Sequence, residues 1–282
     1  MKVKISADGT IDMPQELAER YDISFSPAHV LLDENIYDDG VNITPEQLFS
    51  HVDAGGKSAT CATNIAEYED YFNDLLTRYD AVVHHCQSAK LSANFQNATL
   101  AAEGKPVYVV DFRAISSAGS LVTAESARLA ESGIAPEEIA RIAGENALKI
   151  DTSFVLSTLK YMARGGRCST VQALGANLLK LKPCIEVNTA EGTMDVGKKY
   201  RGTLDAALAQ YVDDRLKDRT DLDTSRPIYV TCSARTPDET VEMVKKRVAE
   251  LATFAETFSP VAGCSISNHC GPATLGLLFF TK

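Results

Sequence analysis

The feature that most constrains the fold is an alternation of short β-prone runs with helical segments along the first half of the chain. Apolar and β-branched residues cluster at 3–6, 28–32, 81–83 and 107–110, and each run precedes a segment with helix signals. Parallel strands need long crossover connections, and helices usually provide them. The alternation therefore predicts an α/β fold in which a mainly parallel sheet carries helices on both faces.

Capping sequences mark where several of these helices begin. The segments TPEQ at 44–47 and TPDE at 236–239 each fit a capping box with proline at the first helical position. Asp12 is expected to cap the first helix, which would begin with Pro14. Further helices are predicted at 64–79, 91–103, 117–131 and 136–148.

The regular alternation ends near Ile150, which is the predicted domain boundary. Residues 1–150 would form an N-terminal α/β domain, and residues 151–282 a C-terminal α/β domain with a mixed sheet. Strands are expected at 154–156, 228–232 and 275–280, with a hairpin that turns at 191–192. The stretch 259–281 carries no formal charge. Polar residues, glycine and proline interrupt it, so we expect a buried loop and strand rather than a membrane span.

The net charge limits the kinds of partner that the chain is expected to bind. Lys and Arg number 28 against 38 Asp and Glu, so the formal net charge is -10, which repels phosphate backbones unless basic residues are concentrated locally. No such concentration is visible in the sequence, so we expect no nucleic-acid partner.

Acidic residues at 8, 12 and 16 interrupt any apolar stretch after the basic start. We therefore expect no secretion signal and a cytoplasmic protein.

The seven cysteines form no Cys-x-x-Cys pair, and their number is odd. This pattern argues against a disulfide framework and against a zinc knuckle. Cys264, His269 and Cys270 lack a fourth metal ligand at a standard spacing. We therefore predict no metal site and interpret the cysteines as buried free thiols.

The candidate chemistry lies in polar loops after the predicted strands, because ligands of open α/β sheets gather at the carboxyl ends of the strands. Ser92 falls near a helix start, where it would cap the helix or favour an anion. The hydroxyls of 60–64 would cap the next helix or converge with Ser92 on a carboxylate. Arg164 and Arg167 flank a glycine pair, a pattern that suits an oxyanion site and a solvated loop equally. His269 either contacts a ligand acid or is a satisfied core histidine.

Taken together and in order, these loops resemble those of the DegV family of bacterial fatty-acid-binding proteins, whose members include the lipid-carrying subunits of fatty acid kinase. The resemblance spans nearly the whole chain and rests on short segments that are specific as an ordered set. These segments are DGTIDMP at 8–14, DGVNITP at 39–45, TCATN at 60–64, SAKLSANFQ at 88–96, LKYMARGGR at 159–167, KLKP at 180–183, RG at 201–202 and HCGP at 269–272, followed by LG at 275–276.

The resemblance implies a long-chain fatty acid lying between two α/β domains, with its carboxylate held by hydroxyls and its tail in the C-terminal domain. Thr60 and Ser92 stand at the hydroxyl positions, and His269 matches a residue near the head group. Arg167 and Arg201 match basic positions at the mouth, near a separate kinase or its phosphate. Neighbouring pocket residues depart from the family's usual letters, which predicts an altered head-group pocket. They are Cys61, Ala62, Ala93 and Asn94.

We therefore expect a carrier that presents the fatty-acid carboxylate to the catalytic protein of fatty acid kinase for conversion into acyl phosphate. The chain itself would catalyse nothing and need no cofactor, because it has no phosphate-cradling glycine loop and no Gly-x-Ser-x-Gly or His-Glu-x-x-His motif. Burying about 14 methylenes at roughly 0.8 kcal/mol each would contribute about 11 kcal/mol before ordering costs. Candidate apolar wall residues are Leu174, Leu178, Leu179, Leu181 and the run 275–280.

Two other classes of function remain as alternatives. The main one is a cysteine-dependent enzyme acting on a small carboxylate or acyl substrate, with Cys61 or Cys168 as a nucleophile activated by a nearby base. The weaker one is a nucleic-acid regulator, which the negative charge opposes.

Overall fold

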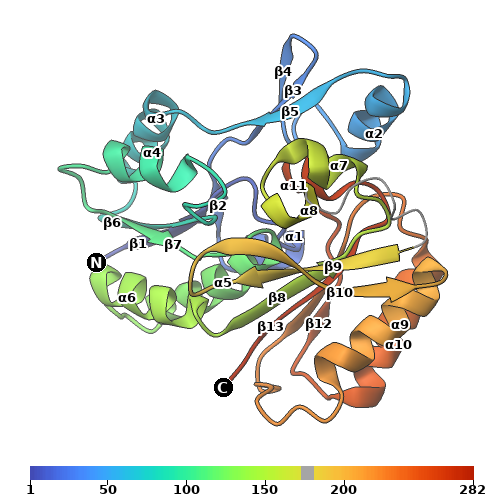
Figure 1. Cartoon of the computed structure of the whole chain (residues 1–282). Coiled ribbons are helices and arrows are strands. Elements are labelled where there is room, and N and C mark those ends of the chain that lie inside the picture. The colour runs from blue at the N-terminus through green and yellow to red at the C-terminus, as the bar shows by residue number, and fades with distance from the viewer. Residues whose placement is uncertain (173–180) are drawn as a thin grey trace.

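Three sheets organise the residues that the computed structural model describes, which are 1–172 and 181–282 (Figure 1). The first is parallel throughout, in the order β2 (Ser24–Phe25), β1 (Val3–Ala7), β6 (Ala81–Cys86) and β7 (Val107–Asp111). The second is mixed, in the order β10 (Thr193–Arg201), β9 (Leu181–Asn188), β8 (Ile150–Val155), β13 (Leu275–Phe280), β11 (Ile228–Cys232) and β12 (Thr257–Phe258). The prediction of an α/β fold with a parallel sheet followed by a mixed one is confirmed.

The third sheet was not predicted. It is antiparallel, in the order β4 (Asn35–Asp38), β3 (His29–Leu32) and β5 (Ser58–Cys61). The run at 28–32 does form a strand, but it belongs to this small sheet rather than to the parallel one. In Figure 1 the third sheet projects from the body of the molecule, with β5 leading back toward the first sheet.

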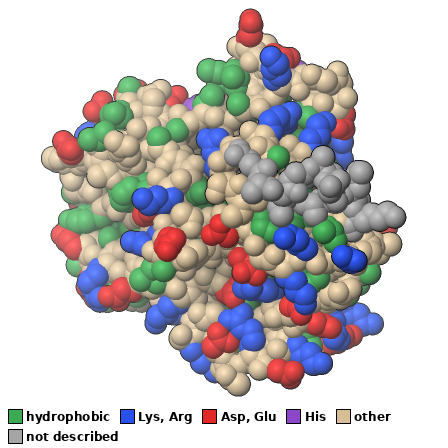
Figure 2. Space-filling view, viewed as in Figure 1, with side chains coloured by type: hydrophobic (Ala, Val, Ile, Leu, Met, Phe, Trp, Pro, Cys, Tyr) green, Lys and Arg blue, Asp and Glu red, His purple; other side chains and the backbone are tan. Residues whose placement is uncertain are grey.

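Helices cover both faces of the parallel sheet and the outer face of the mixed sheet (Figure 1). They are α1 (Gln15–Arg20), α2 (Pro45–Asp53), α3 (Ile65–Leu76), α4 (Asn94–Ala101), α5 (Ser117–Glu131), α6 (Pro136–Ala147), α7 (Lys160–Gly165), α8 (Ser169–Gln172), α9 (Leu204–Leu216), α10 (Asp238–Leu251) and α11 (Cys264–Cys270). No described helix is both long enough and apolar enough to cross a bilayer. On the face seen in Figure 2, Lys and Arg side chains are interspersed with Asp and Glu.

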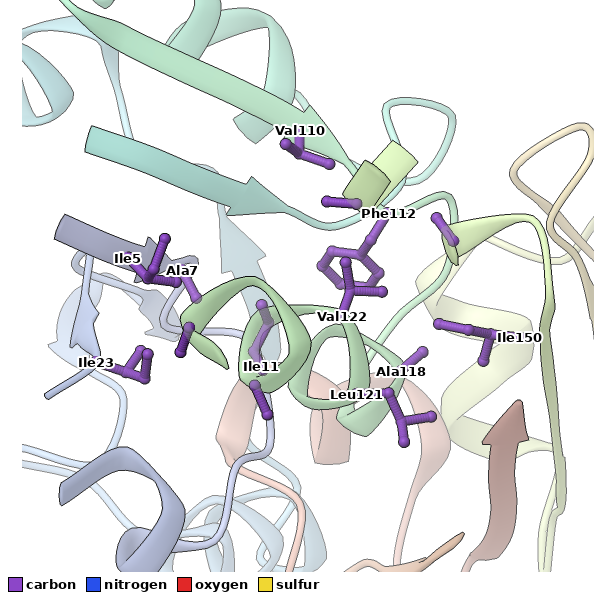
Figure 3. Close-up of a cluster of buried hydrophobic side chains, with 14 of the residues drawn as sticks. Ile5, Ala7, Ile11, Ile23, Val110, Phe112, Ala118, Leu121, Val122 and Ile150 are labelled. Atoms are coloured by element: carbon purple, nitrogen blue, oxygen red, sulfur yellow. The ribbon is translucent and has the colours of Figure 1, made fainter. Parts of the chain in front are cut away.

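Helix α5 lies in the core that the first two sheets share (Figure 3). Its Ala118, Leu121 and Val122 belong to one buried cluster with residues of β1 and β7 and with Leu278 and Phe280 of β13. Ile150 is the first residue of β8 and is buried in the same cluster. Both halves of the chain therefore contribute to one core, and the domain boundary near Ile150 stays a prediction.

Strand β13 separates two hydrophobic layers. Leu275, Leu277 and Phe279 pack in the cluster formed with α9 and α10, whereas Leu278 and Phe280 face the cluster around α5. This alternation follows from the period of two of a strand. The run 275–280 therefore serves mainly as the central core strand of the mixed sheet.

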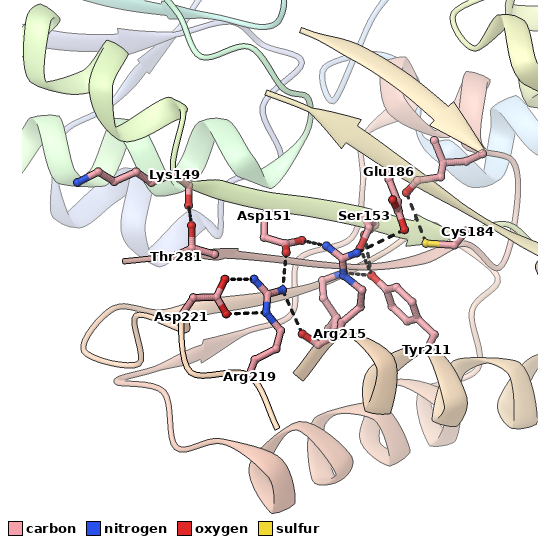
Figure 4. A network of polar contacts seen from close by, with 12 residues as sticks. Lys149, Asp151, Ser153, Cys184, Glu186, Tyr211, Arg215, Arg219, Asp221 and Thr281 are labelled. Carbon is pink, nitrogen blue, oxygen red and sulfur yellow. Dashed lines mark hydrogen bonds and ion pairs between the residues drawn. The ribbon is translucent and has the colours of Figure 1, made fainter. Parts of the chain in front are cut away.

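Polar contacts fasten α9 and the turn after it to the mixed sheet (Figure 4). Asp151 on β8 pairs with Arg215, and its other oxygen lies 2.6 Å from Nη1 of Arg219. The Tyr211 hydroxyl donates to the carbonyl of Ser153 at 2.8 Å and accepts from the amide of Leu277 at 2.9 Å. Because these arginines are engaged by carboxylates, we assign the network a structural role.

Several predicted helix starts need correction. The capping box at 44–47 is confirmed, and Asn64 caps α3 in the same way. The predicted box at 236–239 is wrong, because Pro237 is the N-cap of α10 and Thr236 donates instead to the Ser233 carbonyl at 2.7 Å. Asp12 does not cap α1, whose N-cap is Pro14. The uncharged stretch 259–281 contains β13 as predicted, but it also contains the unpredicted helix α11.

Candidate functional site

A cavity of about 180 Å³ lies where β5, the loop before α4 and helix α11 meet. We call it the head-group cavity. Its wall combines hydroxyl, amide, imidazole and guanidinium groups with apolar side chains such as Ile115, Met162 and Ile266. Eight of the nine predicted site residues line it, namely Thr60, Cys61, Ala62, Ser92, Ala93, Asn94, Arg167 and His269. The structure therefore brings these remote segments together, and their role in binding stays a prediction.

Thr60 and His269 form a polar pair at this cavity. Thr60 lies on β5 opposite Val30 of β3, and its Oγ1 is 3.0 Å from Nε2 of His269. Burial lowers the pKa of His269 to about 4, and the charge of Arg167 acts in the same direction, so the imidazole is neutral near pH 7. A neutral ring that donates from Nε2 to Thr60 leaves the Thr60 proton free for an acceptor in the cavity.

Gly165, the last residue of α7, makes room for this imidazole. A Cβ at Gly165 would lie 2.2 Å from Nδ1 of His269, which no side chain could occupy without moving the ring. Gly166 has a φ of 68° and is the C-cap of the helix. The pair thus has a packing role and a capping role, and the turn places Arg167 beside the cavity, where its Nη1 donates to the Gly165 carbonyl at 2.7 Å.

Ser92 reaches the head-group cavity from the loop between β6 and α4. In this loop the amides of Leu91 and Ser92 both donate to the Ser88 carbonyl, at 2.9 and 3.1 Å. The Ser92 Oγ accepts from the amide of Asn94 at 3.2 Å, so its own proton is free to donate. The helix begins at Asn94, later than predicted, and its N-cap is Ala93. Ser92 therefore stands just outside the helix, with its hydroxyl available to a ligand.

The buried carboxylate of Asp8 holds the loop between β6 and α4 in place, a role that the sequence did not indicate. It is fully buried and accepts hydrogen bonds from the Tyr68 hydroxyl at 2.5 Å, from the Gln87 amide at 3.1 Å and from Nδ2 of Asn94 at 3.1 Å. Burial opposes ionisation, but the hydrogen bond and charge of His84 together with those donors outweigh it, so the pKa of Asp8 lies below its usual value. Asn94 is therefore engaged by Asp8 through its amide nitrogen.

Two further acids hold the N-terminus of α11. Asp39 accepts from the amides of Cys264 and Ser265 at 2.8 and 2.6 Å, and Asp12 accepts from the Gly263 amide at 2.7 Å. This arrangement corrects the predicted role of Asp12, which serves this distant helix instead of α1. Burial raises the pKa of Asp12 to about 7, and the nearby charge of Asp39 also raises it.

A second, apolar cavity of about 30 Å³ adjoins the first, and we call it the tail cavity. The two share Ile115, Ile266 and Cys270 in their walls. The tail cavity is further lined by residues of the mixed sheet and the loop before α11, including Phe154, Leu278 and Ala262. A partly polar cavity and an apolar cavity therefore lie side by side and share these three wall residues.

Some predicted positions fall elsewhere. Arg201 is exposed at the end of β10, where it pairs with Leu181, and it does not line the head-group cavity. Leu181 is only half-buried, and of the run 275–280 only Gly276 and Leu278 line the tail cavity. Leu174, Leu178 and Leu179 lie outside the described residues.

The cysteines are free thiols, six buried and Cys61 half-buried. In the described ranges, Cys264, His269 and Cys270 do not form a metal-ligating group. His269 bonds to Thr60, and no hydrogen bond joins it to a cysteine in the part of the chain that the structure describes. Cys168 is buried and contacts the Thr170 hydroxyl at 3.4 Å. Among the residues that the structure describes, no hydrogen bond joins Cys61 or Cys168 to a base that would activate the thiol.

Comparison with known proteins agrees with this geometry. The family model described as "Uncharacterised protein, DegV family" matches residues 2–282. A fatty acid-binding protein of Thermotoga maritima is 28% identical, over 98% of this chain and 96% of its own. A solved DegV family protein from Thermus thermophilus, described with fatty acid binding, is 26% identical and superposes with a TM-score of 0.86 over 100% of both chains. A solved lipid-binding DegV protein from Thermotoga maritima is 25% identical, with a TM-score of 0.85 over 100% of this chain and 99% of its own. The chain belongs to the DegV family.

Proposed function

We propose that this chain binds a long-chain fatty acid, with the carboxylate in the head-group cavity and the tail directed into the tail cavity, which at about 30 Å³ must widen to hold the whole chain. The observation that carries the proposal is that a partly polar cavity and an apolar cavity adjoin at Ile115, Ile266 and Cys270. A single amphiphilic ligand with a polar head and an apolar chain suits such a wall. The fatty-acid-binding relatives support the same ligand class.

The head group would be held by donors. The hydroxyls of Thr60 and Ser92 each have a proton free for a carboxylate oxygen, and Arg167 adds positive charge at the same wall. Hydrogen bonds to a charged group contribute about 1.5–3 kcal/mol each, whereas the buried tail contributes about 0.8 kcal/mol per methylene. The head-group contacts therefore orient the acid, and the tail provides most of the affinity.

We further propose that the bound carboxylate is presented to a separate kinase. Ala62, Ala93 and Arg167 at the head-group cavity are exposed, whereas the residues around the tail cavity are mostly buried, so the acid end faces the surface. In this reaction a carboxylate oxygen would form a bond to the terminal phosphorus of a nucleoside triphosphate, while the bond to the leaving nucleoside diphosphate breaks. The chain would supply orientation and the partner would supply the phosphoryl chemistry.

Native mass spectrometry of freshly purified protein tests the binding proposal. We expect a population heavier by the mass of a long-chain fatty acid, and delipidation should lower the melting temperature because the ligand stabilises only the folded state. Palmitate added back should restore it. Protein that is always apo, with a melting temperature that no fatty acid changes, would refute the proposal.

A pair of variants separates capture from presentation. Ser92→Ala should weaken palmitate binding about tenfold to a hundredfold by removing one donor to the carboxylate. Arg201→Ala should leave palmitate affinity unchanged, because Arg201 lies outside the cavity wall, yet slow acyl phosphate formation with a matching kinase. Calorimetric titration and a coupled kinase assay measure the two effects. Wild-type affinity in Ser92→Ala, or tenfold weaker binding in Arg201→Ala, would show that these roles are assigned wrongly.

A further inference from the structure

Three side chains with metal-ligating atoms meet inside the first sheet, outside the walls of the head-group and tail cavities. Asp8 follows β1, and His84 and Cys86 lie on the neighbouring strand β6. The register that pairs Ser6 with His84 brings Asp8 level with Cys86, on the same face of the sheet. One ligand atom from each of the three lies within 4.8 Å of the other two, and all three residues are fully buried. They therefore form a preassembled set of oxygen, nitrogen and sulfur ligands.

The second nitrogen of His84 carries the argument, because nothing in the described chain satisfies it. Nδ1 of His84 lies 2.9 Å from the Ser6 Oγ, whereas Nε2 is buried and has no hydrogen-bond partner among the described residues. His85, the next residue on β6, differs in this respect. Its Nδ1 is 3.1 Å from the Ser6 carbonyl, and its Nε2 is 2.9 Å from the Ser126 Oγ. Of these two buried histidines, only His84 presents an unused ligand atom.

The position of this nitrogen fits a shared metal ion better than a hydrogen bond. Nε2 of His84 faces Oδ1 of Asp8 at 3.4 Å, which is longer than the usual N–H···O distance. Zinc binds imidazole nitrogen and carboxylate oxygen at about 2.0–2.2 Å in tetrahedral geometry, so two such ligands lie about 3.4 Å apart. The other separations, none above 4.8 Å, would shorten by no more than about 1.4 Å on binding.

Charge and coordination number also suit a divalent ion. Binding would displace the thiol proton of Cys86, so the thiolate and the Asp8 carboxylate would balance the two charges of the ion. The Tyr68 hydroxyl, which is 2.5 Å from Oδ1 of Asp8, is the available fourth donor. A buried site of this kind would be neutral as a whole, which low-polarity surroundings favour.

The surroundings hold the ligands in place. The other oxygen of Asp8 accepts from the Gln87 amide and from Nδ2 of Asn94, both at 3.1 Å. Three aromatic rings pack against the His84 imidazole with centroids 5.5, 5.9 and 5.2 Å away, namely Tyr68, Tyr71 and Phe72. Metal ligands in proteins are oriented by such hydrogen bonds and enclosed by such apolar shells.

We propose that Asp8, His84 and Cys86 bind one Zn²⁺ ion inside the first sheet. A set of carboxylate, imidazole and thiolate suits zinc, whereas Mg²⁺ and Ca²⁺ prefer oxygen ligands alone. The ion would join the ends of β1 and β6, from which the next residues lead to Thr10 and Gln87 in the wall of the head-group cavity. This proposal replaces the expectation of no metal site, which rested on cysteine spacing, because the ligands here come from two strands. It does not depend on the proposed function.

Metal analysis of the untagged full chain tests the site directly. Protein that is unfolded, refolded with excess Zn²⁺ and dialysed should retain about one zinc ion per chain, as a single buried site requires. Refolding with Co²⁺ instead should give a thiolate-to-cobalt charge-transfer band in the near ultraviolet, since Cys86 supplies sulfur to the ion. Refolded wild-type protein without zinc, or bound Co²⁺ without that band, would overturn the assignment.

Variants identify the ligands. Cys86→Ser keeps the size of the side chain but removes the thiolate, so it should abolish the cobalt band and weaken Zn²⁺ binding about a hundredfold or more. Cys184→Ser is the matched control, because Cys184 is an equally buried thiol on β9 and belongs to the other sheet; it should keep both the band and the zinc. A band that persists in Cys86→Ser, or is lost equally in Cys184→Ser, would contradict the proposal.

Ser6→Ala tests the positioning of His84 without touching a ligand. The loss of the partner of Nδ1 should weaken Zn²⁺ binding about tenfold to a hundredfold while the cobalt band keeps its wavelength. Unchanged affinity in this variant would show that Ser6 does not orient a metal ligand and would count against the site. If Cys86→Ser does not fold, Ser6→Ala and the wild-type cobalt spectrum still decide the assignment.

Discussion

Replacing Thr60 by valine would test the centre of the proposed site with the least disturbance. Valine has nearly the same shape as threonine and favours strands, so β5 should keep its pairing with β3. The change removes one hydroxyl, which is the partner of Nε2 of His269 at 3.0 Å and the proposed donor to the fatty-acid carboxylate. Two separate losses are therefore expected.

The first loss is in affinity. Removing one donor to a charged acceptor costs about 1.5–3 kcal/mol, which corresponds to about tenfold to a hundredfold weaker palmitate binding. Hexadecanol has the same tail without the carboxylate, so its affinity should fall much less. The second loss is in stability, because Nε2 of His269 would be left buried without a partner, at a cost of about 1–3 kcal/mol to the apo protein.

Calorimetric titration and thermal unfolding of the delipidated protein measure these losses independently. Thr257→Val is the matched control, since Thr257 is exposed on β12 and the chemical change is identical. A variant that is less stable yet binds palmitate as wild type does would show that Thr60 only supports His269. An equal loss for palmitate and hexadecanol would show that the cavity changed shape, and it would refute the reasoning about the carboxylate.

Three other changes probe the surroundings of the site. Ala262→Leu fills part of the tail cavity and should weaken palmitate binding by about 2 kcal/mol, which is the burial of two or three methylenes. The shorter octanoate should bind with unchanged affinity, and equal losses in titrations of both acids would contradict the prediction. Gly165→Ala should displace His269 and weaken palmitate binding, because the added Cβ would lie 2.2 Å from Nδ1 of His269. The control Gly144→Ala has open space around its Cβ and should raise the melting temperature slightly. Asp12 has a folded pKa of about 7 and an unfolded value of 3.8, so its contribution to stability is complete below pH 3.8 and is lost as the pH rises to about 7. The stability of Asp12→Asn relative to wild type should therefore rise between pH 4 and pH 7.5, by a total on the order of 4 kcal/mol. Denaturant unfolding of both proteins at these two pH values measures the rise, and an equal stability difference at both would contradict the prediction.

The sequence predicted those parts of the site that depend on local pattern. The alternation of strands and helices placed the loop 88–96 at the edge of a sheet, whereas Thr60 was expected before a helix and lies on the unpredicted strand β5. The structure brings Thr60 and Ser92 to one cavity. The resemblance to known relatives pointed to His269, whose partner across the cavity is Thr60. Arg201 was expected at the mouth on the same basis, but nothing in its local sequence could show that β10 ends outside the cavity wall.

The unpredicted parts depend on contacts between remote segments. Helix α11 is buried on nearly all sides and consists largely of small or polar residues, so it has no amphipathic stripe to mark it. Its N-terminal amides are held by Asp12 and Asp39, which lie more than 200 residues earlier in the chain. Asp8 likewise accepts hydrogen bonds from Tyr68, Gln87 and Asn94 across the first sheet. Such pairings leave no periodic signal in a single sequence.

Two of these remote contacts connect the third sheet to the site. The segment that follows β4 supplies Asp39 to the N-terminus of α11, and β5 supplies Thr60 to His269 near its C-terminus. The small sheet therefore holds α11 at both ends, while Ile266 between them faces the head-group and tail cavities. Any movement of the small sheet would shift the Thr60 donor on β5 and, through the contacts of Thr60 and Asp39 with α11, the apolar wall that Ile266 forms. The position of the carboxylate and the position of the tail are thus coupled through the contacts of the small sheet with α11, an arrangement that suits the holding of an amphiphile in a single orientation.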